Sequence, residues 1–162
     1  MIRLANEKDV NEILRLLDQV NNVHAAGRPD LFIMNSRKYT EDGVKRLLED
    51  SSIRIFVCPN EESSNCDAAC HLRGYAICGI VEPLPSVNLV PHKALYVDDI
   101  CVDEVCRRKH VGTELYQHVR SFAGEIGCYH ITLNVWALNP SAQKFYESLG
   151  MKPLTTAMED IL

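Results

Sequence analysis

Three consecutive positive side chains and a histidine lie directly before a predicted helix: Arg107, Arg108, Lys109 and His110. They are the densest positive charge in a chain with 22 acidic residues against 17 lysines and arginines. The helix should begin between Val111 and Thr113, where its first N–H groups have no partner within the helix and attract anions. Gly112 would let the backbone approach a bulky anion. The segment predicts a pyrophosphate-binding turn, with a solvated basic helix start as the alternative.

Two adjacent carboxylates, Asp98 and Asp99, lie within a predicted strand from Ala94 to Val102. A carboxylate in a cleft can accept a proton as a general base or hold a cation. Because side chains alternate along a strand, only one of the two should face a cleft unless the strand contains a bulge. Hydrogen bonding at a strand end is the alternative for both.

The 162 residues, 46% of them hydrophobic, predict one domain spanning residues 1–162. No apolar run approaches the ~20 residues that span a bilayer, and the polar start, from Met1 to Glu7, does not resemble a signal peptide. A cytoplasmic protein is therefore expected. The net charge of −5 argues against a nucleic-acid partner and against an anionic membrane surface.

Seven cysteines are present, and an odd number surrounded by apolar residues favours reduced thiols over a disulfide framework. The spacing of Cys66, Cys70 and His71 is a weak metal-binding pattern without a second group of ligands, so no metal is expected.

Hydrophobic periodicity predicts helices following Asn6, following Thr40, from about Val111 to Ile126, and from Ser141 to Leu149. Strands are expected at 2–5, 53–58, 72–81, 94–102 and 131–136, with one or two short strands in the tail. Residues 21–34 should be irregular. This order predicts an α/β (α+β) fold of three layers, in which a mixed, mostly antiparallel sheet has helices on both faces.

Two segments resemble the motifs of the GNAT superfamily, the acyl-CoA-dependent N-acyltransferases. The string RRKHVG is similar to R/Q-x-x-G-x-G/A, with Arg107 leading, His110 in place of the first glycine and Gly112 as the second. The string from Asn139 to Met151 resembles N-x-x-A-x-x-F/L-Y-x-x-x-G-F/M, and the spacing between the two segments also fits. The element order matches the family's fold over essentially the whole chain, although only residues 94–153 carry specific motifs.

The resemblance implies a GNAT-like fold with a splayed strand pair and acetyl-CoA, without a metal, as the cosubstrate. It places the pantetheine between the strands at 96–102 and 131–136, and the pyrophosphate on the turn that precedes the third helix. The residues it assigns to acetyl-CoA are Ile100, Cys101, Val102, Arg107, Arg108, Lys109, His110, Val111, Gly112, Thr113, Asn139 and Tyr146.

The same resemblance makes Tyr146 the candidate general acid, because the departing thiolate needs a proton and a phenol can supply it. Core packing is the alternative for this tyrosine. The run from Leu95 to Val102 resembles the acidic strand of diamine and polyamine acetyltransferases, which favours Asp98 as the base or amine-binding anion and leaves Asp99 a structural role.

Candidates for the acceptor site come from two segments besides the acidic strand. The loop after the first helix, a region that shapes the acceptor site across this fold, contributes His24, Arg28, Asp30 and Phe32. An ion-paired brace between Arg28 and Asp30 is the structural alternative. The strand at 131–136 contributes Asn134 and Trp136. Ribosomal-protein N-terminal acetyltransferases often have glutamate where this chain has Asn134. Since an asparagine cannot act as a base, N-terminal acetylation is the less favoured activity.

The resulting hypothesis is an N-acetyltransferase that acts on a primary amine of a small molecule by direct attack in a ternary complex. Acetylation of a protein N-terminus or lysine is the enzymatic alternative. A non-catalytic acyl-CoA sensor is the alternative from another class. A homodimer is possible by analogy with the family.

Overall fold

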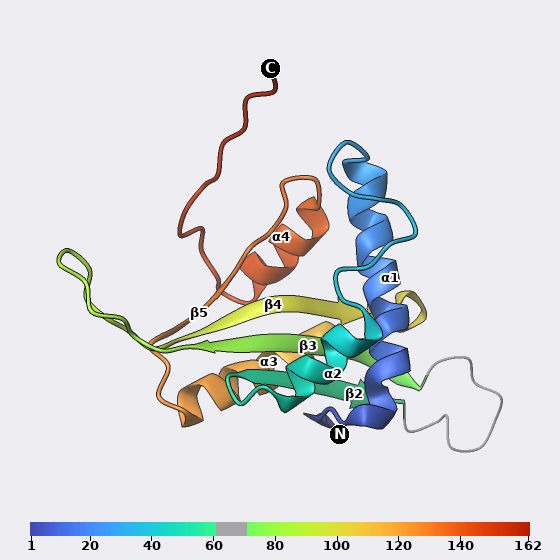
Figure 1. The fold of residues 1–162 in the computed structure, drawn as a ribbon, viewed down its shortest axis with the longest axis horizontal. Coiled ribbons are helices and arrows are strands. Elements are labelled where there is room, and N and C mark those ends of the chain that lie inside the picture. Colours follow the sequence, from blue (N-terminus) through green and yellow to red (C-terminus); the bar gives the residue numbers. More distant parts are fainter. Residues whose placement is uncertain (61–70) are drawn as a thin grey trace.

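The computed structural model describes residues 1–60 and 71–162, and its centre is a mixed β-sheet (Figure 1). The strands follow one another across the sheet in chain order, and every neighbouring pair is antiparallel except β4 and β5, which are parallel. The strands are β1 (Arg3–Leu4), β2 (Ile53–Pro59), β3 (Leu72–Val81), β4 (Ala94–Val102) and β5 (His130–Leu133). The predicted mixed sheet is confirmed.

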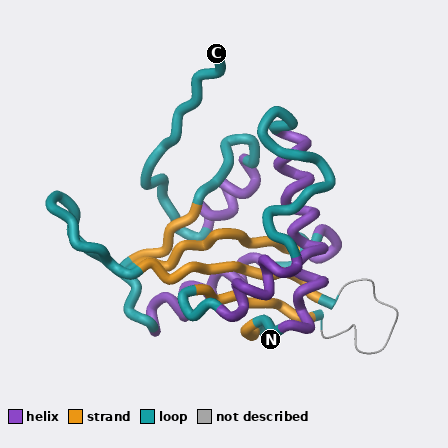
Figure 2. Tube along the Cα trace, in the orientation of Figure 1, coloured by secondary structure: helices purple, strands orange, loops and turns teal. Residues whose placement is uncertain are grey.

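Helices cover both faces of this sheet (Figure 2). Helices α1 (Val10–Gly27) and α2 (Glu41–Glu49) lie on one face, and α3 (Val111–Glu125) lies on the other. Helix α4 (Pro140–Ser148) stands beside the end of β4, across from α1. Two 3₁₀ turns, η1 (Glu7–Asp9) and η3 (Glu104–Cys106), precede α1 and α3. The predicted three-layer α/β fold is therefore confirmed.

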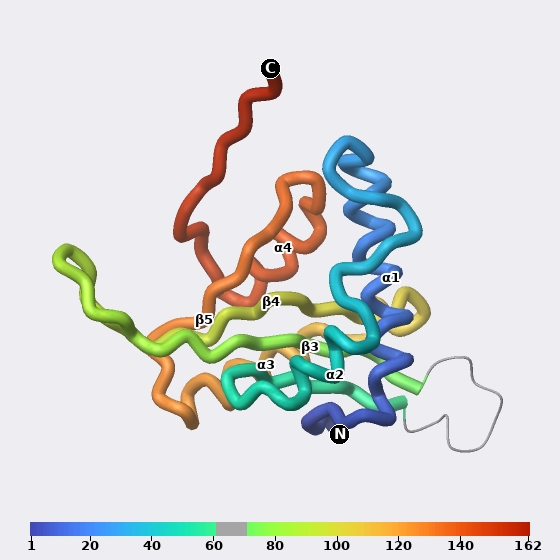
Figure 3. The backbone as a smooth tube through the Cα atoms, viewed as in Figure 1, coloured from blue at the N-terminus to red at the C-terminus, as the bar shows by residue number. Residues whose placement is uncertain are grey.

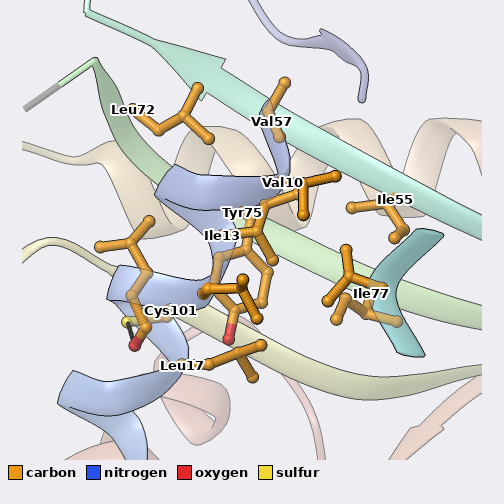
Figure 4. Packing of buried hydrophobic residues seen from close by; sticks show 12 residues of the cluster. Val10, Ile13, Leu17, Ile55, Val57, Leu72, Tyr75, Ile77 and Cys101 are labelled. Carbon is orange, nitrogen blue, oxygen red and sulfur yellow. Dashed lines mark hydrogen bonds between the residues drawn. The ribbon is translucent and has the colours of Figure 1, made fainter. Parts of the chain in front are cut away.

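Helix α1 is fixed by its cap and by a continuous apolar face. Asn6 accepts a hydrogen bond from the Lys8 N–H, and Asp9 accepts one from the Asn6 N–H, so that the predicted cap is a reciprocal capping box. Val10, Ile13 and Leu17 point from the helix onto the sheet (Figure 4). There they meet side chains of three strands, including Ile55, Val57, Tyr75, Ile77 and Cys101.

Helix α3 packs closely against β3 and β4 because β3 carries a glycine where they meet. A Cβ on Gly74 would lie 2.6 Å from the Cys101 carbonyl oxygen and 3.0 Å from the Leu115 side chain. No other residue fits there without moving the neighbouring strand or the helix. Since α3 begins at the basic turn, this close contact also fixes the turn relative to β4.

Three expectations about elements are wrong. Residues 21–27, expected to be irregular, continue α1 to Gly27, because Val20, His24 and the fully buried Ala25 extend the inward-facing stripe beyond the weak helix formers at 21–22. Strand β5 ends at Leu133 instead of 136, since its pairing with β4 stops at Val97. Within the described residues, the tail beyond 150 contains no strand.

Two segments project from the body of the molecule (Figure 3). One is the connection between β3 and β4, residues 82–93, and the other is the tail after α4. Arg28, just beyond α1, forms a two-bonded ion pair with Glu159 of the tail at 2.8 and 2.9 Å. In the part of the chain that the structure describes, no helix is both long enough and apolar enough to cross a membrane.

We expect Gly74→Ala to lower the free energy of unfolding by about 2–3 kcal/mol, because the added methyl overlaps a backbone carbonyl that cannot rotate away. The control is Gly79→Ala in the same strand, whose Cβ would meet only the Ile53 side chain at an ordinary 3.6 Å. Urea denaturation measures both variants. Equal stability of the two would contradict the close approach of β3, β4 and α3.

Candidate active site

A cleft of about 940 Å3 opens where β4 and β5 separate. The two strands pair only from Ala94 to Val97 on β4, and beyond that point β4 continues while the chain after Leu133 turns away toward α4. Helix α1, β4, the start of α3 and α4 all contribute to the walls. The predicted splayed strand pair is thus present, and it leaves one edge of β4 without a neighbouring strand from Asp98 onward.

A β-bulge in β4 turns both adjacent carboxylates into this cleft. Val97 pairs with Cys78 and Asp99 pairs with Ile77, so Asp98 is an extra residue without a partner on β3. Strict alternation would have placed the two carboxylates on opposite faces. With the bulge, both Asp98 and Asp99 line the cleft on the α1 side of the sheet.

Both carboxylate oxygens of Asp98 are held by the segment between α1 and α2. Its Oδ1 accepts a bond from the Lys38 Nζ at 2.7 Å, and its Oδ2 accepts one from the Tyr39 hydroxyl at 2.6 Å. Burial, followed by the charge and hydrogen bond of Asp98, raises the pKa of Tyr39 well above its ordinary value. Asp98 is therefore a neutralised carboxylate that holds the 28–40 segment against β4.

Asp99 is in a different environment. Its Oδ2 accepts a bond from the Tyr75 hydroxyl at 3.1 Å, and within residues 1–60 and 71–162 it forms no ion pair. Burial raises the pKa of Asp99 to about 6, and the Asp98 charge adds to this, although the Tyr75 hydrogen bond and the Lys38 charge oppose it. A carboxylate with such a pKa can gain and lose a proton near neutral pH.

Tyr146 lies on α4 and lines the same cleft, with its ring 5.1 Å from that of Phe145 and 6.4 Å from that of Tyr116. Burial raises the pKa of Tyr146 well above its ordinary value, and the negative charge of Asp99 raises it further. The phenol therefore keeps its proton throughout the neutral range, so it can donate a hydrogen bond or act as an acid but cannot act as a base.

The basic turn forms the wall of the cleft at the start of α3. Arg108 and His110 both have φ of 60°, a left-handed conformation that costs a residue with a Cβ roughly 1–2 kcal/mol. The Arg107 Nε donates to the Val102 carbonyl at 3.3 Å and fixes the turn to the end of β4. Of the predicted residues in this turn, those that line the cleft are Arg107, Arg108, His110, Val111, Gly112 and Thr113; Lys109 does not.

Gly112 has a packing reason for being a glycine in addition to the predicted one. Its Cβ would lie 3.2 Å from the Phe145 ring and 3.5 Å from the Val102 side chain. The absence of a side chain here lets α4 approach the beginning of α3, so that Tyr146, the residue after Phe145, is carried into the cleft.

Asn139 also lines the cleft, and its side-chain oxygen caps α4 by accepting bonds from the Ala142 N–H and the Ser141 hydroxyl. This leaves its amide NH2 as the group that could contact a cofactor. Ile100, Cys101 and Val102 line the cleft as predicted. Burial raises the pKa of the Cys101 thiol to about 12, which makes it a poor nucleophile.

Three rings from separate segments meet at the cleft. His24 comes from α1, Phe32 from the segment after α1, and Trp136 from the chain after β5. The ring centroids of His24 and Phe32 lie 5.0 Å apart, as do those of Phe32 and Trp136. We call these three residues the aromatic cluster. Gly27 helps to form it, because its Cβ would lie 3.0 Å from the Leu138 side chain where the two segments approach.

Arg28 and Asp30 do not line the cleft. They form the ion-paired brace that was the structural alternative, with Arg28 Nη2 at 2.7 Å from the Asp30 Oδ2. Asn134 does line it, and its Nδ2 donates to the Tyr96 hydroxyl at 3.2 Å. The sequence does not predict Lys38, Tyr39 and Tyr75, because residues that contact a carboxylate from distant segments leave no local pattern.

All five cysteines in the described part of the chain are free. Within that part, no group of three or more histidine, cysteine, aspartate or glutamate side chains could hold a metal ion. Cys66 and Cys70 of the weak metal-binding pattern lie outside the described residues.

Comparison with known proteins identifies a family. The model of the acetyltransferase (GNAT) family matches residues 17–151. A search of curated protein sequences finds no significant match. Among solved structures, a point variant of the BH1408 protein from Bacillus halodurans superposes with a TM-score of 0.92 at 26% identity, covering 100% of this chain and 99% of the other.

Two more distant structures have named activities. The glucosamine-6-phosphate N-acetyltransferase from Arabidopsis thaliana has a TM-score of 0.69 at 20% identity, with coverage of 99% of this chain and 97% of the other. The aminoglycoside N-acetyltransferase AAC(6')-Iy in complex with CoA has a TM-score of 0.69 at 16% identity, covering 100% and 98%. At these identities the two share the fold with this chain.

The strained turn yields a prediction about stability. We expect His110→Gly to raise the free energy of unfolding by about 1 kcal/mol, because glycine adopts the left-handed conformation without steric cost. Lys109→Gly is the control, since Lys109 does not have a positive φ, and it should lower that energy by about 0.5–1 kcal/mol. Denaturation in the absence of any nucleotide measures the free energy of unfolding of both variants. If both variants were less stable than the wild type, the conformation of His110 would not be strained.

Proposed function

Since the chain belongs to the acetyltransferase (GNAT) family, we propose that it transfers an acetyl group from acetyl-CoA to a primary amine of a small molecule. The family assignment confirms the predicted resemblance and makes the protein an acyl-CoA-dependent acyltransferase. The observation that carries the proposal is the meeting of the basic turn, Asp99 and the Tyr146 phenol in a single cleft.

The residues around the cleft fit a nucleotide with a long, amide-containing arm. The edge of β4 that lacks a strand partner offers backbone groups at Ile100 and Val102 to such an arm. The turn at 107–113 offers positive side chains and the free N–H groups of a helix start to a pyrophosphate. When bound, acetyl-CoA supplies the acetyl group as an activated thioester.

Asp99 is the proton acceptor that the geometry favours over the predicted Asp98. Both oxygens of Asp98 are already occupied by Lys38 and Tyr39, and its charge is neutralised. Asp99 has no ion-pair partner in the described chain, and its pKa of about 6 suits a base that works near neutral pH. Asp98 then acts as a positioning residue that orders the segment carrying Phe32.

Proton movement balances in a single direct attack. The ammonium of the acceptor gives one proton to Asp99, the amine nitrogen bonds to the acetyl carbon as the carbon–sulfur bond breaks, and the sulfur leaves as a thiolate. Tyr146 donates its phenolic hydrogen to that thiolate, and the second proton of the acylated nitrogen passes through water to the resulting phenolate. Asp99 releases its proton to solvent, so the products are a neutral amide and a thiol, and both residues regain their starting states. Because its pKa is raised, the phenol remains a donor at every pH at which Asp99 is an effective base.

A protein N-terminus or lysine remains the alternative acceptor, and a non-catalytic sensor the alternative from another class. A sensor has no use for a buried carboxylate without a cation, because burial of such a group costs stability. We propose further that residues 1–162 act as one domain, since α1 and α4 line the same cleft. The cytoplasmic location and the homodimer stay predictions.

Acetyl transfer is tested with acetyl-CoA and a panel of small primary amines, by following free thiol release. We expect amine-dependent release, and a raised melting temperature with acetyl-CoA alone. Tyr146→Phe should lower kcat at least about 10²-fold while the melting shift persists, because only the phenolic proton is lost. An unchanged kcat would eliminate the role of Tyr146, and an absent melting shift would eliminate acetyl-CoA.

The pH dependence tests the role of Asp99. In the wild type, kcat/KM should fall as the pH drops through about 6, because protonated Asp99 cannot accept a proton. Asp99→Asn should lose that acidic limb together with most of kcat. Asp98→Asn is the control. It should raise the acceptor KM and keep the acidic limb, moved to lower pH because the Asp98 charge no longer raises the pKa of Asp99.

Stability supplies an independent readout for the same carboxylate. A raised pKa means that the folded state binds the proton more tightly, so Asp99 costs stability above its folded pKa of about 6, and this cost disappears as the pH falls below its unfolded value near 4. Asp99→Asn should therefore be more stable than the wild type at pH 7.5, by on the order of 2 kcal/mol, and no more stable at pH 4. A gain at both pH values would point to a packing effect.

A further inference from the structure

We propose that the acceptor is a primary amine with a single positive charge on a flat, ring-bearing apolar body, such as an arylalkylamine. This inference rests on the proposed function and specifies the substrate class of the same cleft. Two independent observations carry it: the aromatic cluster on the wall, and the balance of charge beside it.

The aromatic cluster offers a ready surface for a flat apolar group. The His24 and Phe32 rings are tilted by 39°, and the Phe32 and Trp136 rings meet edge to face at 78°, so the three rings form an angled wall. His24 and Trp136 are 6.3 Å apart. Trp136 is 45% exposed although it lines a cleft, which leaves much of its ring uncovered. A ring held against this wall would gain both burial and edge-to-face contacts.

The cluster carries no charge of its own that would attract a second cation or an anion. Burial and the nearby charge of Lys38 lower the pKa of His24, so the imidazole is neutral at pH 7. Val20 and Val23, from the same helix as His24, also line the cleft. Apolar and aromatic side chains thus predominate where the body of the acceptor would lie.

The balance of charge in the cleft fits one ammonium group and no more. Lys38 neutralises Asp98 at 2.7 Å, and Arg37, the other cation from this segment on the wall, is paired with Asp18 at 2.8 Å. Asp99 is then the one carboxylate lining the cleft that has no ion-pair partner among the described residues. A second ammonium would find no free carboxylate, because Lys38 already occupies Asp98 and Arg37 already occupies Asp18.

This arrangement disfavours acceptors with several positive charges, such as polyamines and aminoglycosides. Two parts of the cleft therefore recognise different parts of the acceptor: Asp99 binds the ammonium group, and the aromatic cluster binds the rest of the molecule. Lys38 is accordingly a specificity residue, which neutralises the charge that a dication would otherwise use.

The test compares kcat/KM for four amines: 2-phenylethylamine, n-pentylamine, 1,5-diaminopentane and glucosamine. We expect 2-phenylethylamine to exceed n-pentylamine by about tenfold because it has a ring, and n-pentylamine to exceed 1,5-diaminopentane because it has a single charge. Trp136→Leu should raise KM for 2-phenylethylamine about tenfold, raise KM for n-pentylamine much less because a leucine still offers an apolar surface to an alkyl chain, and leave KM for acetyl-CoA unchanged. The control is Tyr129→Leu. The Tyr129 ring is exposed and does not line the cleft, so this variant should leave the KM values for both amines and for acetyl-CoA unchanged.

Lys38→Gln tests the balance of charge. It frees a second carboxylate, so 1,5-diaminopentane should gain about tenfold relative to n-pentylamine. A wild-type preference for 1,5-diaminopentane, glucosamine or a peptide amine overturns the inference. An equal loss of kcat/KM for every amine in Trp136→Leu overturns it as well. Either result leaves the proposed acetyl transfer intact. If acetyl-CoA binds and no amine of any kind is acetylated, the proposed function fails and this inference with it.

Discussion

The one-residue bulge in β4 is the constraint on which the rest of the site depends. Without it, Asp98 and Asp99 would point to opposite faces of the sheet, and one of them would enter the apolar layer beneath α3. The bulge occurs next to the point where β4 and β5 stop pairing, between Val97 and Asp99. A local change of register therefore places both carboxylates in the cleft that the diverging strands open.

The two carboxylates then differ through their partners. Asp98 accepts hydrogen bonds from Lys38 and Tyr39 of the segment between α1 and α2, and these contacts hold that segment against β4. Asp99 receives the hydroxyl of the buried Tyr75 and remains a carboxylate without a cation in the described structure. Burial that destabilises an ionised group is the same effect that raises its pKa, so the raised pKa of Asp99 and a loss of folding stability have one cause.

Close packing connects the two ends of the cleft, the basic turn at 107–113 and the aromatic cluster. Gly74 lets α3 and its basic turn lie against β3 and β4, Gly112 lets Phe145 of α4 approach that turn, and Gly27 lets α1 meet the segment after β5. These three approaches determine the positions of the turn, of Tyr146 and of the aromatic cluster. Side chains from both ends of the chain are thereby held around one strand.

Local patterns in the sequence determined a large part of this architecture. The apolar periodicity of α1 and α3, the caps at Asn6 and Thr40, and the limits of β3 and β4 are short-range features, as are the two motifs that indicated the family. Such features depend on neighbours within a few residues, so they can be recognised without a structure.

The tertiary structure alone decided the features that depend on contacts between distant segments. The bulge at Asp98 requires β3 as a partner, the end of β5 depends on where β4 diverges, and the continuation of α1 to Gly27 is supported by packing that buries Ala25. The different environments of Asp98 and Asp99 likewise come from Tyr39 and Tyr75, 59 and 24 residues away along the chain. A sequence records which groups are present, whereas the pKa and the direction of a side chain depend on what surrounds it after folding.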